Sequence, residues 1–468
     1  MKRIQFIICL VAFVMTSYRG VAQNQTAVFK LPAYEKVVLK NGLTVYLMEQ
    51  HEVPMINVSV IVPAGAIYDA QQSGLANMTA TALMHGTKNM TKSQLEEALD
   101  FIGATVYTYA SKESAGLSAK FASKDQDQVL GIIRDVLLKP TFNATEFEKD
   151  KKILLSELEQ AKESPRNVIG NYFDQLYYGS HVYANPASGR TTTVTNITSA
   201  DAQKFYKDYY MPNSSAIAVV GDFKTKEMKA KLNNLFGAWA KGSTPANAAS
   251  QTVAPVNTAR VLLVNKDDAR ETTFFIGGPG VSRSNPDYVA MEVVNTVLGG
   301  RFTSWLNDEL RVNTGLTYGA SSNFTRLKNA GTFQISTFTA TKNTEAAIDK
   351  ALEVVNRLHT TGIDEKTLTS AKNYVKGQFP PRYETSGQLA GLLTQMFWYG
   401  FDESFINNFQ KTVDELTVDK AKQIVAKYFP KNNMQFVLVG KADDIRKIAE
   451  KYGKVTEVQI KEDTLKSF

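Results

Sequence analysis

Residues 197–221 read ITSADAQKFYKDYYMPNSSAIAVVG, and residues 416–440 read LTVDKAKQIVAKYFPKNNMQFVLVG. Matching positions in the two stretches are 219 residues apart throughout, from Ile197 and Leu416 to Gly221 and Gly440, without a gap. In each stretch, apolar residues at helical spacing lead into an asparagine turn, and a β-branched run then stops at glycine. A similarity with so long a period predicts a duplicated domain.

The rest of the chain fits two domains. A length of 468 residues is enough for two cores of ordinary size. Residues 241–258 are rich in small and polar residues and contain two prolines, a composition typical of a linker. We therefore expect an N-terminal domain over residues 30–240 and a C-terminal domain over residues 259–468.

Local patterns predict the elements of these domains. A hairpin is expected around the Asn41-Gly42 turn, and strands followed by runs of helices indicate an α+β fold. In the second half, strand 272–276 and helix 288–298 continue in the same order. The elements expected in the first half are strands 56–62, 105–110 and 114–119 and helices 74–85, 92–101, 126–137 and 144–162.

Residues 1–22 have the features of a secretory signal peptide. Met1-Lys2-Arg3 is followed by a mostly apolar run over residues 4–14 and then by small residues before Gln23. A membrane anchor is the alternative, but this run and every later one are shorter than the roughly 20 apolar residues of a span. Cys9, the only cysteine, lies in this leader, so we expect a mature protein without disulfides. Such a chain suits the periplasm of a Gram-negative bacterium.

Composition and charge are those of an ordinary globular protein. Hydrophobic residues make up 43% and charged residues 21% of the chain. Of the formal net charge of +7, three positive charges lie in the leader. The remaining basic residues are interspersed with acidic ones, which argues against nucleic acid as a partner.

Residues 74–87, GLANMTATALMHGT, resemble the active-site helix of the pitrilysin/insulinase (M16) metallopeptidases. In that family the helix reads His-x-x-Glu-His and is followed by Gly-Thr. Here Asn77, Ala80 and Thr81 stand at the places of the first histidine, the catalytic glutamate and the second histidine. Glu157, which follows Thr81 by 76 residues, resembles the third zinc ligand of the family, and Asp150 and Glu146 resemble its acidic support.

This substitution pattern predicts that the chain binds no metal of its own. A zinc peptidase needs three protein ligands, an open position for water, and a general base. An amide and a neutral hydroxyl are poor zinc ligands, and Ala80 leaves no base. Glu157 is then the only residue retained at a ligand position, and a solvated carboxylate that pairs with a lysine is its alternative interpretation. His85, one turn beyond Thr81, is expected to project toward the following loop. His51, His181 and His359 have no partner at ligand spacing and suit surface or packing roles.

Residues 297–319, VLGGRFTSWLNDELRVNTGLTYG, resemble a second M16 signature, Leu-Gly-Gly, Ser-x-Leu, Glu-Leu-Arg and Gly-Leu-x-Tyr. The resemblance implies that Arg311 and Tyr318 face a zinc site from the opposite domain or subunit. There the tyrosine hydroxyl would stabilise the oxyanion and the arginine would hold a neighbouring backbone carbonyl of the peptide. Both roles suit preorganised donors. The alternative is that Arg311 ends a helix and Tyr318 packs in a strand.

The resemblance covers nearly the whole mature chain. It implies two homologous domains, each an antiparallel β-sheet packed against helices, that form half of a clamshell. Peptides that are small or unfolded would bind as an extra strand at a sheet edge. The function it implies is the non-catalytic, substrate-binding subunit of a heterodimeric zinc peptidase, with Zn²⁺ on a His-x-x-Glu-His partner. An inert scaffold or peptide-binding protein is the alternative. An independent peptidase lacks support, because no nucleophile context stands out.

Overall fold

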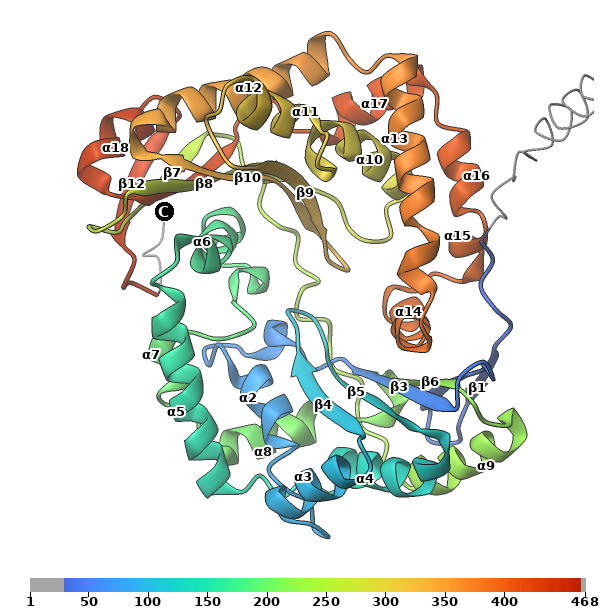
Figure 1. Cartoon of the computed structure of the whole chain (residues 1–468). Helices are drawn as coiled ribbons and strands as arrows, with labels where there is room; N and C mark the ends of the chain where they lie inside the picture. The colour runs from blue at the N-terminus through green and yellow to red at the C-terminus, as the bar shows by residue number, and fades with distance from the viewer. Residues whose placement is uncertain (1–28, 464–468) are drawn as a thin grey trace, which may run out of the picture.

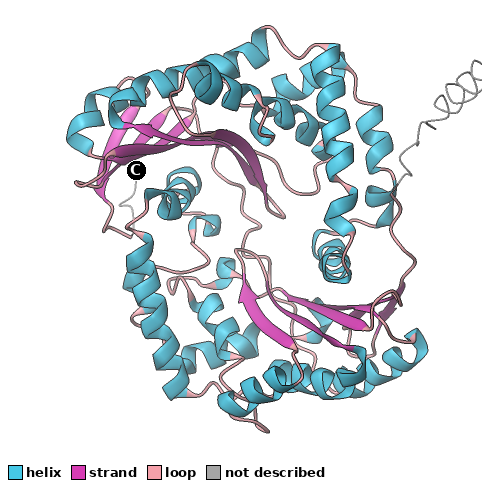
Figure 2. Cartoon of the chain, in the orientation of Figure 1, coloured by secondary structure: helices cyan, strands magenta, loops and turns pink. Residues whose placement is uncertain are grey.

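The computed structural model describes residues 29–463, and two halves with the same plan follow each other along the chain (Figure 1). The predicted signal peptide and Cys9 lie outside the described residues. Among residues 29–463, no helix is both long and apolar enough to cross a bilayer. Figure 2 shows the helices packed around two separate sheets. The α+β prediction is therefore confirmed.

The first half contains the following elements in chain order: β1 (Glu35–Val38), β2 (Thr44–Glu49), β3 (Met55–Val62), η1 (Ala66–Tyr68), α2 (Leu75–Ala82), α3 (Lys92–Phe101), β4 (Thr105–Ala110), β5 (Ala115–Ala122), η2 (Ser123–Asp125), α4 (Gln126–Leu138), α5 (Ala144–Ala161), α6 (Pro165–Tyr178), η3 (Val182–Ala184), α7 (Thr191–Val194), α8 (Ser199–Tyr209), η4 (Pro212–Ser214), β6 (Ala216–Gly221) and α9 (Thr225–Phe236).

The second half contains β7 (Arg260–Asn265), β8 (Glu271–Pro279), α10 (Tyr288–Asn295), η5 (Thr296–Gly300), α11 (Trp305–Asn307), η6 (Asp308–Asn313), β9 (Ala320–Arg326), β10 (Gly331–Ala340), η7 (Thr341–Asn343), α12 (Thr344–Thr360), α13 (Glu365–Gln378), η8 (Pro380–Tyr383), α14 (Ser386–Tyr399), α15 (Glu403–Asn407), α16 (Phe409–Asp414), α17 (Val418–Tyr428), β11 (Gln435–Gly440), α18 (Ala442–Ala449) and β12 (Lys454–Gln459). Of these, η5 and η6 are π-helical turns and the other η elements are 3₁₀ turns.

The repeat in the sequence is a repeat in the structure. Helix α17 and strand β11 begin and end 219 residues after α8 and β6, respectively. The two sheets have matching strand orders, β1-β2-β6-β3-β5-β4 and β12-β7-β11-β8-β10-β9. In each sheet the strand that follows the long helical run returns to the centre.

The expectation of purely antiparallel sheets is wrong. Strand β6 pairs in parallel with β2, and β7 pairs in parallel with both β11 and β12. The remaining pairs are antiparallel, including the predicted β1–β2 hairpin. Strand β6 reaches the sheet only after helices α4 to α8, and such a long connection can bring a strand back in either direction. Both sheets are therefore mixed.

The β1–β2 hairpin shows why its turn needs glycine. Gly42 has a φ of 86°, a conformation that side chains disfavour. A Cβ atom there would lie 2.8 Å from the Cβ of Asn213. Asn41 donates hydrogen bonds from its side chain to the carbonyls of Phe236 (2.8 Å) and Trp239 (3.1 Å). The turn thus connects the hairpin to the end of the first half.

Each half supplies a helix that covers the sheet of the other half. Helix α6 lies on the second sheet, where Phe173 packs in one apolar cluster with Leu262 and Val437. A Cβ on Gly277 of β8 would come within 2.4 Å of the Phe173 ring. Helix α14 covers the first sheet, and its Leu393 belongs to the same apolar cluster as Met48 of β2. Figure 1 shows both helices between the sheets. The two halves therefore share their cores.

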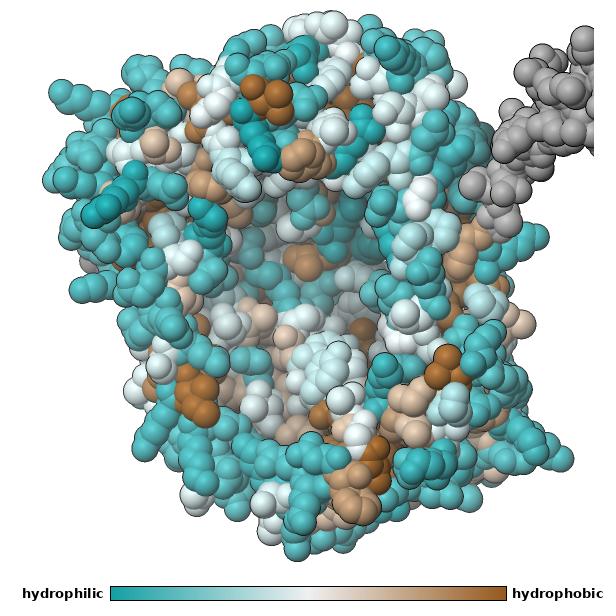
Figure 3. Space-filling model, in the orientation of Figure 1, coloured by the Kyte–Doolittle hydropathy of each residue, from teal (hydrophilic) through white to brown (hydrophobic). Residues whose placement is uncertain are grey.

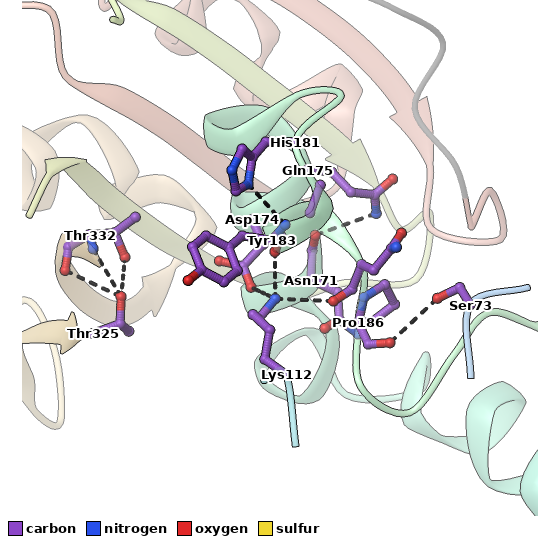
Figure 4. Close-up of polar contacts among 12 residues, drawn as sticks. Ser73, Lys112, Asn171, Asp174, Gln175, His181, Tyr183, Pro186, Thr325 and Thr332 are labelled. Atoms are coloured by element: carbon purple, nitrogen blue, oxygen red, sulfur yellow. Dashed lines mark hydrogen bonds and ion pairs between the residues drawn. The ribbon is translucent and has the colours of Figure 1, made fainter. Parts of the chain in front are cut away.

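Polar contacts fix the β4–β5 turn against the end of α6 (Figure 4). The Lys112 ammonium donates to Asp174 (2.8 Å) and to the carbonyls of Tyr183 (2.6 Å) and Asn185 (3.1 Å). Next to it, the Glu113 carboxylate accepts hydrogen bonds from the Tyr183 hydroxyl and from the backbone N–H of Lys328 in the second half. Edge strand β4 is thereby held near the second half.

We predict that Phe173→Ala loosens the halves from each other as well as destabilising the chain. Loss of a fully buried phenylalanine costs about 3–5 kcal/mol of unfolding free energy. Phe236→Ala is the matched control, because Phe236 is equally buried but packs only within the first half. We expect limited proteolysis to cut near residues 240–259 faster in the Phe173 variant than in the Phe236 variant. Equal cutting rates would contradict this role of α6.

Candidate functional site

The first candidate site lies at helix α2, whose start is held by a buried carboxylate. Gly74 precedes the helix with a φ of 102°. Asp69 accepts hydrogen bonds from the N–H groups of Gly74 (2.7 Å) and Ala76 (2.8 Å). Burial raises the pKa of Asp69 to about 7. Asp69 thus satisfies backbone donors that the first turn of a helix leaves free.

Helices α2 and α5 bring three of the predicted residues to one cavity. Asn77 and Thr81 on α2 and Glu157 on α5 line a cavity of about 270 Å³. Glu157 is exposed, and its side chain forms no hydrogen bond or ion pair with another described residue. Ala80 does not line the cavity. Its side chain is fully buried, and its carbonyl accepts a 2.6 Å hydrogen bond from the Thr108 hydroxyl of β4.

The donor set at this cavity does not fit zinc. Thr81 donates its hydroxyl proton to the carbonyl of Asn77 (3.1 Å), and the Asn77 side chain offers only an amide. Within residues 29–463, no group of three or more His, Cys, Asp or Glu side chains could hold a metal ion. His85 and Asp150 also line the cavity but bond to each other at 2.7 Å, so one carboxylate, an amide and a hydroxyl remain, which lack the three-ligand set of a catalytic zinc site.

His85 lies at this cavity, and the expectation that it projects toward the loop is wrong. The sharp turn comes at Gly86, whose φ is 113°. The His85 N–H still bonds to the carbonyl of Ala82 (3.1 Å), so the helical path carries His85 inward. Its side chain is almost fully buried, with Nε2 at 2.7 Å from the Asp150 carboxylate. The sequence signal that could have placed His85 at the cavity is Gly86, because a glycine there marks the turn as coming after His85.

The acidic residues of α5 hold cationic or polar groups of this chain. Asp150 accepts from His85 and lies 3.6 Å from the Lys92 ammonium, which also lies 3.8 Å from Glu146. Burial lowers the pKa of His85, although the hydrogen bond to Asp150 opposes this. Neutral His85 therefore donates from Nε2, and its buried Nδ1 has no hydrogen-bond partner among residues 29–463.

We predict that His85 makes the fold sensitive to acid. Its folded pKa lies below the unfolded value of about 6.5, so the unfolded chain binds the proton more readily and stability is lost as pH falls below about 6.5. His85→Gln should reduce this loss, measured as urea midpoints at pH 8 and pH 5.

His51→Gln is the control with the opposite sign. The hydrogen bond to Asp222 raises the pKa of His51, so His51 adds stability at low pH, which is lost as pH rises through its folded pKa. Its replacement should therefore increase the acid sensitivity. Identical acid sensitivity in wild type and the His85 variant would contradict the prediction.

We also predict that two substitutions give the cavity a zinc site. Asn77→His with Thr81→His places imidazoles at i and i+4 on one helix face, opposite Glu157. This variant should bind about one Zn²⁺ per chain, as a His₂Glu site with an open position does. Adding Glu157→Gln should weaken zinc binding in a competition titration. Unchanged affinity would mean that Glu157 does not reach the histidines.

The second candidate site is built by residues 297–319, which form η5, α11 and η6 and lead into β9. A Cβ on Gly299 would lie 2.3 Å from the backbone nitrogen of Ser322, so the Leu-Gly-Gly stretch permits a close approach to β9. Glu309 in η6 forms an ion pair with Arg357 (2.8 Å) on α12. These contacts anchor the segment to the body of the second half.

Arg311 and Tyr318 lie against each other at an open hollow. The guanidinium carbon of Arg311 is 4.9 Å from the centroid of the Tyr318 ring and 4.6 Å from that of Phe302. Tyr318 is 76% exposed and precedes β9 instead of packing within it. The hollow has a volume of about 500 Å³, and Arg301 and Tyr374 also line it. The stack orders two hydrogen-bond donors that solvent can reach.

The two candidate sites lie in different halves. Helices α2 and α5 are on the lower left of Figure 1 and α11 is near its top. Their cavities share no lining residue. The space-filling view shows a hollowed face between the halves (Figure 3). Within one chain the structure therefore does not bring Arg311 and Tyr318 to Glu157.

Comparison with known families gives a consistent assignment over both halves. Residues 44–189 match the family model described as "Insulinase (Peptidase family M16)", and residues 196–375 match "Peptidase M16 inactive domain". Together these two matches cover more than half of the chain.

The names of individual relatives include both a zinc protease and a non-peptidase homolog. A Bacillus subtilis protein named "Uncharacterized zinc protease YmxG" is 22% identical over 82% of this chain and 90% of its own. A Helicobacter pylori protein named "Non-peptidase homolog YmxG" is 23% identical over 84% and 90%. A crystal structure from Pseudomonas fluorescens, described as a peptidase M16 inactive domain, is 26% identical with a TM-score of 0.81 over 87% of this chain and 98% of that one.

Proposed function

Because this chain belongs to the M16 peptidase family, we propose that it is the non-catalytic, substrate-binding subunit of a heterodimeric zinc peptidase. The observation that carries the proposal is the contrast between its two sites. The α2–α5 cavity has Glu157 without the paired histidines of a zinc site, whereas half-buried Arg311 and exposed Tyr318 stack at an open hollow.

The chemistry of the pair suits binding of a peptide at a site completed by another chain. Arg311 offers a permanently charged fork of donors for a backbone carbonyl. The Tyr318 hydroxyl offers a single donor that could face a developing oxyanion, and donors fixed before the reaction are the effective ones. A partner subunit with an intact His-x-x-Glu-His helix would supply Zn²⁺ and the general base.

The proposal has further parts that follow from the leader and the fold. The complex acts outside the cytoplasm, in the periplasm, because residues 1–22 have the composition of a signal peptide. Its substrates are small or unfolded peptides, since an edge strand can pair only with an extended chain. β4 and β9 are edge strands of the two sheets, and both line the cavity between the halves.

An inert scaffold is the second candidate function, and the name of the Helicobacter pylori relative favours it. A scaffold needs the fold and its surfaces, but it does not need the Arg311 side chain or the Tyr318 hydroxyl. The two functions therefore differ in the effect of conservative changes at these positions.

We predict that Tyr318→Phe lowers peptide cleavage by the assembled complex by about 100-fold in kcat, the usual loss for one oxyanion donor. The phenylalanine keeps the stack with Arg311 and removes only the hydroxyl. The measurement uses a quenched, unstructured peptide, first with this chain alone and then with the His-x-x-Glu-His subunit of the same organism. We expect no cleavage by this chain alone and chelator-sensitive cleavage by the pair.

Tyr452→Phe is the matched control for the loss of a hydroxyl. Tyr452 bonds to Asp349 (2.8 Å) on α12 and lines neither candidate site, so this variant should cleave like wild type. Arg311→Ala should also reduce cleavage. If both site variants retain full activity in the complex, the scaffold function replaces the proposal. Chelator-sensitive cleavage by this chain alone would show that it has its own metal site.

A further inference from the structure

The space between the two halves contains a cavity whose described lining has positive charge only. This cavity has a volume of about 820 Å³ and lies between strands β3, β4 and β5 of the first sheet and α14 and β9 of the second half. The charged residues among its described lining are Lys120, Arg283 and Arg326, and no Asp or Glu is among them. Low-dielectric walls around charges of one sign strengthen the field in such a cavity.

The two arginines are held by aromatic rings instead of carboxylates. The guanidinium carbons of Arg283 and Arg326 lie 4.0 Å and 4.1 Å from the centroid of the Tyr288 ring. Arg283 also lies 4.7 Å from the rings of Phe401 and Phe405. Stacking of this kind orients a guanidinium and leaves its N–H groups available at the edge. The buried Nε of Arg326 has no hydrogen-bond acceptor among the described residues.

Two carboxylates outside the cavity lining accept hydrogen bonds from other groups of the chain. Glu292, which lines a neighbouring cavity together with Arg326, accepts a 2.6 Å hydrogen bond from Arg382 at Oε1, and its buried Oε2 has no hydrogen-bond partner among the described residues. Glu113 accepts hydrogen bonds from the Tyr183 hydroxyl and the Lys328 N–H. Both residues are outside the cavity lining. Glu292 therefore offsets part of the charge of Arg326, whereas Arg283 and Lys120 have no carboxylate partner among the described residues and are available to an external anion.

The hollow at Arg311 has the same sign. Its described lining contains Arg301 and Arg311 and no acidic residue. By contrast, the α2–α5 cavity is lined by Asp150 and Glu157. Positive charge thus lines the central cavity and the hollow at Arg311, whereas a third cavity at β9 contains Glu292 beside Arg326 and Arg382.

We propose that the central cavity selects acidic peptides, with Arg283 and Arg326 binding an Asp or Glu carboxylate and Lys120 adding attraction from the opposite wall. An arginine fork matches a carboxylate in two parallel hydrogen bonds. The inference deepens the proposed function and rests on it in taking a peptide as the ligand. It assigns a substrate class, peptides with carboxylate side chains, to a chain whose overall composition shows no such preference.

The test is a binding measurement on the full chain without its partner. Fluorescence anisotropy would compare three unstructured peptides of equal length: one with several Asp and Glu residues, one with Asn and Gln in their places, and one with Lys. We expect the acidic peptide to bind at least about tenfold more tightly than the neutral one, the size of one charge-assisted contact. The preference should shrink as salt is raised from about 0.05 to 0.5 M.

Variants locate the preference in the cavity. Arg283→Gln and Arg326→Gln should each weaken binding of the acidic peptide by about tenfold and leave the neutral peptide unchanged. Lys120→Gln should weaken binding of the acidic peptide to a smaller extent. Lys120 is exposed on β5, so this substitution should not unfold the chain. Arg446→Gln is the matched control, because it removes one positive charge from the exposed surface of α18.

Equal binding of the three peptides, or wild-type selectivity in the cavity variants, would overturn the proposal. Tighter binding of single-stranded RNA than of the acidic peptide would also overturn it and assign the cations to nucleic acid. This outcome is independent of the proposed function as a substrate-binding subunit. If Tyr318→Phe leaves cleavage intact while the acidic preference persists, only the proposed subunit function fails. If Tyr318→Phe reduces cleavage but the chain shows no preference for acidic peptides, only this inference fails.

Discussion

The exchange of covering helices between the halves is the constraint on which the rest of the structure depends. α6 of the first half covers the second sheet and α14 of the second half covers the first. A sheet needs a partner layer to bury its apolar face, and here each half provides the layer that the other lacks. The exchange sets the distance and angle between the sheets, so it also shapes the central cavity. Its walls come from both halves for the same reason.

The two candidate sites are supported in different ways. The α2–α5 cavity keeps its frame through contacts that need no metal, namely the Asp69 cap and the bond from His85 to Asp150. Arg311 and Tyr318 depend on a short, irregular segment that η5 and η6 bend against β9. The first site keeps its helical frame but lacks the side chains that would bind zinc. In the second, the half-buried Arg311 and the exposed Tyr318 are ordered by stacking.

Local features of the fold could be predicted from the sequence because their causes are local. Helix α3 has the predicted bounds, 92–101, because Thr91 and Gln94 form a capping box at its start. The repeat predicts α17 and β11 from α8 and β6, since both copies keep their spacing. The parallel pairing of β6 could not be predicted, because it depends on where a long connection ends. The same is true of α6 and α14, whose amphipathic faces do not say which sheet they cover. The positive cavity joins residues 120, 283 and 326 from separate elements, so no sequence window contains it.

The exchange of covering helices also determines the order in which parts of the fold can be completed during synthesis. Synthesis begins at the N-terminus, and the first sheet is complete once β6 has emerged. The inner face of that sheet, with Tyr46, Met48 and Ala218, then waits for residues 386–399 before it is covered. Exposed apolar surface of this kind attracts chaperones and favours aggregation. A nascent first half therefore keeps one face of its sheet uncovered until the chain is nearly finished, and it can complete its fold only together with the second half.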